Sequence, residues 1–184
     1  VWLQGMLTRL APFPWDPGQS ARHEERLRNL RLLAQRARKR GIGLWLYLNE
    51  PRALPAGFFG TRAGLKGVRE GEYAALCTSV PEVREYLTEA IAQIGRAAPE
   101  LAGFFSITGS ENSTHCWSHH GGAGCPRCGG RAPAEVIAEL NGAFQEGLRR
   151  AGHGQQLIVW DWGWADAWGP DTIARLPRGA LLDR

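Results

Sequence analysis

The stretch GFFSITGSENSTHCWSHHGGAGCPRC, residues 103–128, decides the fold. It opens with an apolar run, residues 103–108, which is typical of a strand covered on both faces of a parallel sheet. The run ends in a turn of small residues that carries a carboxylate, Glu111, and a group of cysteines and histidines follows at once. In α/β barrels the chemistry takes place where strands end. This turn is therefore the first candidate for a functional site.

The same alternation of strand and helix recurs along the chain. Apolar runs predict strands at residues 1–4, 44–48, 103–108 and 156–162, with a last strand beginning at Ala180. Apolar residues at helical spacing predict helices at 20–40, 81–98, 133–151 and 168–176. The segments 5–19, 49–80 and 109–132 are predicted to be connections. This order implies parallel strands joined by right-handed crossovers.

Two architectures fit that order, an open doubly wound sheet and part of an eight-fold barrel. No glycine-rich phosphate fingerprint follows any predicted strand, which disfavours the doubly wound sheet. The long loops follow strands rather than helices, as on the catalytic face of a barrel. We therefore predict an α/β fold in which residues 1–184 form a single incomplete (β/α)8 TIM barrel. The chain opens on Val1 inside a predicted strand, so we expect it to be a piece of a longer polypeptide.

Composition narrows the classes of function. Hydrophobic residues make up 43% of the 184 residues and charged residues 22%, with a net charge of +4, which is ordinary for a globular domain. No apolar run approaches the roughly 20 residues needed to span a bilayer, so no membrane association is expected. The arginine-rich segment 22–40 also carries Glu24 and Glu25, which favours a solvated helix over a nucleic-acid surface. No signal segment is visible, but the N-terminus is expected to be missing, so the location stays open, with the cytoplasm favoured.

Carboxylates stand at the ends of several predicted strands. Glu50 and Glu111 follow successive strands, and Asp161 lies at the end of the next one. Neighbouring strands lie about 4.8 Å apart, so these acids are expected to approach one another. Glycosidases need one protonated carboxyl as a proton donor and a second group that stabilises or captures the oxocarbenium carbon. Burial would raise the pKa of the donor. The alternative is that each acid forms a salt bridge to a loop arginine such as Arg52 or Arg62.

Aromatic side chains crowd the end of the last complete strand. Trp160 and Trp162 fall on the same side of a strand, and indole faces stack well on sugar rings. The alternative is that they only fill the barrel interior. In the early loop, Arg9 and Trp15 are predicted to reach over the pocket, unless Trp15 packs on a helix instead. The other residues predicted to bind substrate are Asn49, Ser110 and Asn112.

The loop 109–132 has the composition of a metal site. Its cysteines have the spacing C-x8-C-x2-C, and tetrahedral Zn²⁺ takes four thiolate or imidazole ligands. A disulfide or free thiols are the alternatives, and the odd number argues against a closed disulfide framework. We predict a structural zinc ion and no organic cofactor. Cys77 is expected to be a small buried filler. The predicted ligands are Cys116, Cys125, Cys128 and His119, with His115 and His120 open as the fourth ligand.

Three segments, taken in order, resemble the catalytic barrel of the family 20 glycoside hydrolases, the β-hexosaminidases. ARKRGIGLWLYLNEPRALP, residues 37–55, resembles the third-strand segment of that family. Residues 76–112, which run from LCTSVPE to SITGSEN, resemble the next unit, where a helix leads to a strand that closes in Gly-Asp-Glu. LIVWDW, residues 157–162, is similar to the fifth strand.

The resemblance implies that the chain spans about strands two to six of eight. It also implies that Glu111 is the general acid/base and that Trp160 walls the sugar pocket. Ser110 stands where the family has an Asp that orients the acetamido group of the substrate. Either Glu50 or Asp161 then supplies that charge, or the substrate is not an N-acetylhexosaminide. The Pro-Gly-His of the family is replaced by Pro51-Arg52.

The leading hypothesis from the sequence is a glycoside hydrolase. The tripeptide Asn49-Glu50-Pro51 also resembles the acid/base strand of the large retaining-glycosidase clan, which would make Glu50 the acid/base. A second class is a carbohydrate-binding barrel without catalysis. A third is a zinc-organised module that contacts nucleic acid. We expect a carbohydrate partner and neither nucleic acid nor membrane, and the oligomeric state is open.

Overall fold

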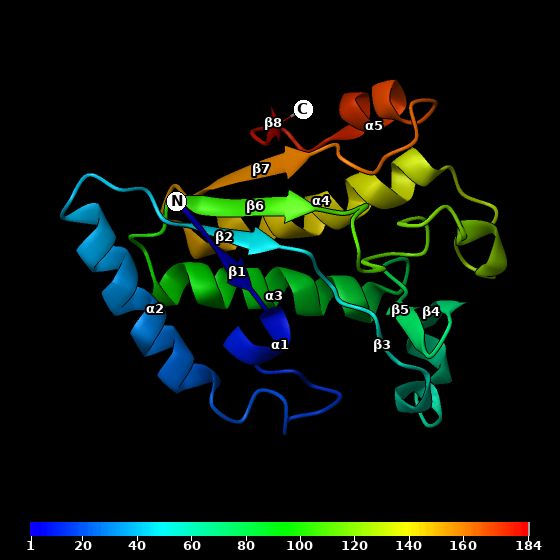
Figure 1. Ribbon diagram of the computed structural model, residues 1–184, viewed down its shortest axis with the longest axis horizontal. Helices are drawn as coiled ribbons and strands as arrows, with labels where there is room; N and C mark the ends of the chain where they lie inside the picture. Colours follow the sequence, from blue (N-terminus) through cyan, green and yellow to red (C-terminus); the bar gives the residue numbers. More distant parts are fainter. Residues whose placement is uncertain (184) are drawn as a thin grey trace.

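The computed structural model describes residues 1–183. Its main feature is a parallel sheet of five strands in the order β1-β2-β6-β7-β8 (Figure 1). The strands are β1 (Trp2–Gly5), β2 (Trp45–Leu48), β6 (Gly103–Ile107), β7 (Gln156–Trp160) and β8 (Leu181–Asp183). The α/β class with a parallel sheet is confirmed. The strands follow one another in chain order, whereas a doubly wound sheet reverses its order near the middle.

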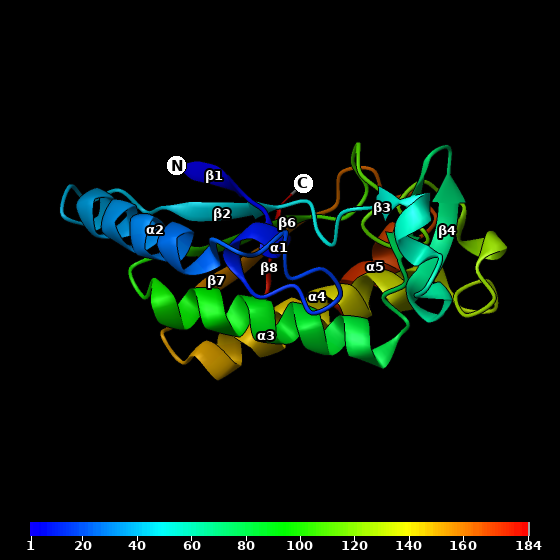
Figure 2. The same cartoon turned by 90° about the horizontal axis from the view of Figure 1, so that it is seen from below.

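Helices connect the strands of the sheet. They are α1 (Leu7–Leu10), α2 (His23–Arg38), α3 (Pro81–Ala97), α4 (Pro133–Ala151) and α5 (Gly169–Arg175). Pro81 and Pro133 stand in the first turns of α3 and α4, where a missing N–H costs nothing. Figure 2 shows α3 and α4 on one side of the sheet, and within residues 1–183 no helix covers the other side. No helix in this part of the chain is long and apolar enough to cross a membrane.

The core lies between the sheet and these helices. Strand residues alternate: Leu46, Phe104 and Leu157 are buried toward the helices, whereas the residues that follow them, Tyr47, Phe105 and Ile158, are only half-buried. On the helix side, Ile91 and Phe144 are fully buried in the same cluster. The apolar spacing that predicts these helices therefore marks the faces that pack.

Two connections contain more structure than their sequence predicts. The segment 5–19 holds the short helix α1. The segment 49–80 folds into a second, antiparallel sheet in the order β3-β5-β4, with 3-10 turns at Ala56–Phe59 and Ala63–Leu65. Its strands are β3 (Leu54–Pro55), β4 (Lys66–Glu70) and β5 (Tyr73–Leu76). This small sheet lies beside the loop 109–132, which has a 3-10 turn at Gly122–Gly124 (Figures 1 and 2).

Helices α3 and α4 approach each other closely at Gly147. An added Cβ there would lie 2.6 Å from the Thr88 carbonyl oxygen and 2.7 Å from Ile91 Cβ. We expect Gly147→Ala to lower the free energy of unfolding by about 1–3 kcal/mol. Gly142 in the same helix has no such neighbour within 4 Å, so Gly142→Ala should raise it by roughly 0.5–1 kcal/mol. Urea denaturation measures both, and equal changes would contradict this packing.

Candidate functional site

Glu50 is a buried carboxyl just beyond the end of β2. Its side chain is 1% exposed. One oxygen accepts a hydrogen bond from the Leu7 N–H (3.3 Å) and the other from the Arg52 N–H (3.2 Å). Burial raises the pKa of Glu50 to about 7, against the opposing effects of the Arg52 charge and the two backbone N–H groups. At neutral pH this carboxyl therefore keeps its proton in a large fraction of molecules.

Glu111 differs from the desolvated acid that the sequence predicts. It is exposed, at the turn after β6. The Ser110 hydroxyl and the backbone N–H of Glu111 donate to the carboxylate and lower its pKa, and the nearby charge of Arg52 lowers it further. Glu111 is therefore ionised at neutral pH, while Glu50 beside the same arginine keeps its proton in about half of the molecules. The Arg52 Nε lies 3.6 Å from a Glu50 carboxylate oxygen, so the salt-bridge alternative is present at Glu50.

A network of amides holds the turn that carries Glu111. Asn49 is 1% exposed, and its Nδ2 donates to the Ile107 carbonyl (3.2 Å) and to the Ser110 hydroxyl (2.6 Å). Asn112 Nδ2 donates to the Asn49 side-chain oxygen. Three residues predicted to bind substrate are thus brought together. Their hydrogen bonds form a chain that ends on the Glu111 carboxylate.

Aromatic rings form a row across the sheet face that no helix covers within residues 1–183. Neighbouring ring centroids are 5.4 Å apart from Trp2 to Tyr47, 6.0 Å from Tyr47 to Phe105 and 5.8 Å from Phe105 to Trp160. Trp160 stacks on Trp162 at 5.5 Å, which confirms that both rings lie on one side. Trp162 is 52% exposed. Asp161 between them lies at the end of β7, where its N–H donates to the Asp183 carbonyl.

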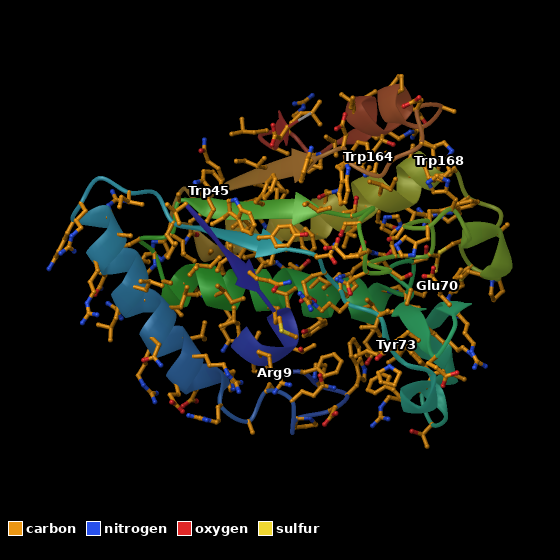
Figure 3. The ribbon with its side chains drawn as sticks, viewed as in Figure 1. Arg9, Trp45, Glu70, Tyr73, Trp164 and Trp168 are labelled. Atoms are coloured by element: carbon orange, nitrogen blue, oxygen red, sulfur yellow. The ribbon has the colours of Figure 1, made fainter. Side chains whose placement is uncertain are left out.

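Arg9 and Trp15 do not join this group. Figure 3 shows Arg9 on α1, away from Trp164, Trp168 and Glu70. Trp15 packs edge-on against Phe13 and Tyr86, both at 5.4 Å, and its indole N–H donates to Glu82 on α3 (2.9 Å). The alternative of packing on a helix is the observed one.

Four buried cysteines gather between the small sheet and the loop 109–132. The Sγ atoms of Cys77, Cys116, Cys125 and Cys128 all lie within 4.8 Å of one another. Cys77 Sγ is 3.8 Å from Cys125 Sγ and 3.7 Å from Cys128 Sγ. Four sulfurs at about 2.3 Å from a central zinc ion in a tetrahedron are separated by about 3.8 Å. Two of the printed separations match this spacing, and the cluster could therefore hold a metal ion.

The surroundings of the cluster favour a thiolate at Cys77. Arg127 Nε donates to Cys77 Sγ (3.3 Å), and the Ser79 hydroxyl lies 3.2 Å from Cys128 Sγ. Hydrogen bonds from Cys116 and Cys128, with Arg127, hold the pKa of the Cys77 thiol below its usual value despite burial. The thiolate is the form that binds metals.

The fourth member of the cluster corrects the predicted ligand set. Cys77, expected to be a filler, takes the place predicted for His119. His119 contacts Glu70 and Ser110 instead. His115 is buried and accepts a hydrogen bond from the Trp117 N–H, and His120 lies against Trp168. Cys77 was missed because it lies on another connection, and the only signal was that it brings the cysteine count to four.

No family model matches the chain, and no curated protein matches it.

Proposed function

We propose that this chain is a carbohydrate-active domain of the glycoside hydrolase type. Glu50 would give its proton to the glycosidic oxygen, and Glu111 would be the ionised partner that stabilises or captures the sugar carbon. One observation carries the proposal: of two carboxyls beside Arg52, Glu50 is buried and Glu111 is exposed, which shifts their pKa values in opposite directions. Such a separation assigns the acid and the base in glycosidases. These roles differ from those implied by the family resemblance, which makes Glu111 the donor.

Buried polar atoms next to Glu50 support a ligand at this point. Arg52 Nη2 and the Tyr86 hydroxyl are buried and have no hydrogen-bond partner within residues 1–183. Buried donors of this kind cost free energy unless a partner satisfies them. Sugar hydroxyls and the glycosidic oxygen are suitable acceptors. Trp162, stacked on Trp160 and half-exposed, would supply the apolar platform for the ring.

We also propose that the five-stranded sheet is a section of a (β/α)8 barrel wall. Two features support this architecture: the strands lie in the sheet in the order of the chain, and α3 and α4 lie on one face of it. In a barrel the face with the aromatic row would look inward, and both acids would lie at the ends of the strands where barrels are active.

The cysteine cluster is proposed to hold one structural Zn²⁺. Four thiolates close the coordination sphere, so no position is left for a substrate or water. The metal would join Cys77, which directly follows β5 of the small sheet, to the loop after β6. It supplies no step of the reaction. Its proposed role is to order the two connections that flank the turn of Glu111.

A carbohydrate-binding barrel without catalysis is the second candidate, favoured by the exposure of Glu111 and by Ser110 in place of an acid. Calorimetry and an assay on a panel of 4-nitrophenyl glycosides separate the two. The enzyme should release nitrophenol above the buffer rate, and Trp162→Ala should weaken binding by about 0.5–1.5 kcal/mol. Exposed Trp2 on the same sheet face provides the control, and Trp2→Ala should leave binding unchanged. Binding without turnover would favour the second candidate. The absence of both binding and turnover would contradict both candidates.

A further inference from the structure

Both ring nitrogens of His119 face hydrogen-bond acceptors. Nδ1 lies 2.7 Å from a carboxylate oxygen of Glu70, and Nε2 lies 2.5 Å from the Ser110 carbonyl oxygen. A carbonyl oxygen accepts and never donates. The same Glu70 oxygen accepts a hydrogen bond from the Ser113 hydroxyl (2.7 Å). A neutral imidazole has one N–H and can satisfy only one of these two acceptors, whereas an imidazolium satisfies both.

We propose that His119 is a positioning residue that works as an imidazolium, tying the turn of Ser110 and Glu111 to Glu70 of the small sheet. Its effect on activity rests on the proposed function, but its protonation does not. The side chain of Ser110 is already held by Asn49, and its carbonyl is held by His119. Ser110 is thus fixed from two directions, and the direction of the Glu111 side chain follows from that.

The charges that face His119 favour the doubly protonated ring. Partial burial of His119 lowers its pKa, but the bonds to the Ser110 carbonyl and to Glu70 outweigh burial and raise it above 6.5. The Ser113 hydroxyl and then His119 lower the pKa of Glu70 below 4.5. His115, the other titratable group facing His119, is completely buried, and burial lowers its pKa to about 3, so it stays neutral.

The stability of the contact between His119 and Glu70 depends on pH, because both groups have shifted pKa values. The stabilisation from His119 is complete below its ordinary pKa of 6.5 and is lost as the pH rises through the raised value. The contribution of Glu70 is complete above 4.5 and is lost as the pH falls through the lowered value. The contact is therefore strongest between pH 4.5 and 6.5.

Histidine-selective ¹⁵N labelling and two-dimensional NMR test this inference on the intact chain. At pH 6.5 the His119 ring should show imidazolium shifts at both nitrogens, with a midpoint above 6.5 that falls in Glu70→Gln. His119→Gln assigns the signal. The control is His153→Gln, because His153 is exposed and far along the chain, and it should leave the His119 midpoint unchanged. A neutral His119 tautomer at pH 6.5, or a midpoint unaffected by Glu70→Gln, would overturn the proposal.

Activity provides the second readout. Misplacing a reacting group costs roughly 10–100-fold in rate, and His119→Gln should lower kcat/KM for an aryl glycoside by that amount. In Glu70→Gln, the contact of protonated His119 with the Ser110 carbonyl should be lost at a lower pH than in the wild type. A normal rate in His119→Gln together with an imidazolium signal would overturn the positioning role while leaving the glycosidase proposal intact. If the wild type shows no turnover, the NMR titration still decides the protonation of His119.

Discussion

Replacing Cys77 with serine is expected to remove the bound metal and to destabilise the region around the loop 109–132. The second hydrophobic cluster of the protein consists of four cysteines and Val136, with few other apolar side chains around it. Burial therefore contributes little there without the metal. Structural zinc sites in small peptides contribute on the order of 10 kcal/mol at neutral pH. Loss of one thiolate should thus lower the free energy of unfolding by several kcal/mol.

Metal analysis after gel filtration measures the first effect and denaturant unfolding the second. Wild type should carry close to a single zinc ion per chain, and Cys77→Ser much less. Cobalt substitution should give sulfur-to-metal absorption in the wild type only. His119→Gln is the matched control, because the spacing in the sequence predicts His119 as a ligand and the structure places it outside the cluster. Retention of zinc in Cys77→Ser with loss in His119→Gln would reverse the assignment.

Replacing Glu50 with glutamine is expected to have opposite effects on activity and stability. Loss of a general acid typically costs 10²–10⁴-fold in rate. The folded protein holds the Glu50 proton up to about pH 7, whereas an unfolded chain releases it near 4.5. The stabilisation from the Glu50 proton is therefore complete below pH 4.5. As the pH rises from 4.5 toward 7, the free energy of unfolding falls by about 3 kcal/mol.

A neutral amide removes this pH dependence. Glu50→Gln should therefore be more stable than the wild type at pH 8, offset in part by the hydrogen bond to the Arg52 N–H that the amide nitrogen cannot accept. Glu111→Gln is the matched comparison. Glu111 is exposed, so its replacement should reduce turnover with little change in stability. A Glu50→Gln protein that is both fully active and less stable would identify Glu50 as a structural residue.

The sequence predicts the main sheet and its helices because both carry long periodic signals. Leu87 and Ile91 on α3, for example, are buried as their spacing indicates. The small sheet gives no such signal. Its strand β3 has only two residues, and its pairing with β5 joins residues about twenty positions apart. Short strands between glycines and prolines are fixed by tertiary contacts, which a local pattern does not contain.

The sequence predicts which types of residue form the site better than it predicts their exposure and contacts. The strand-end position of Glu50 and Glu111 follows from the parallel order, but their opposite exposure depends on α1, whose first N–H binds Glu50. By spacing alone, the three histidines within six residues are equally good candidates for the fourth metal ligand. The choice of Cys77 depends on β5 delivering it to the loop, which is a long-range contact.

The pH dependence of hydrolysis tests the central claim most directly. The account predicts that kcat/KM of the wild type on an activated aryl glycoside falls as the pH rises through about 7, because Glu50 loses its proton. In Glu50→Gln the residual rate should show no such fall. A wild-type rate that stays constant from pH 5 to 9, or the same fall in Glu50→Gln, would contradict the assignment of Glu50 as the proton donor.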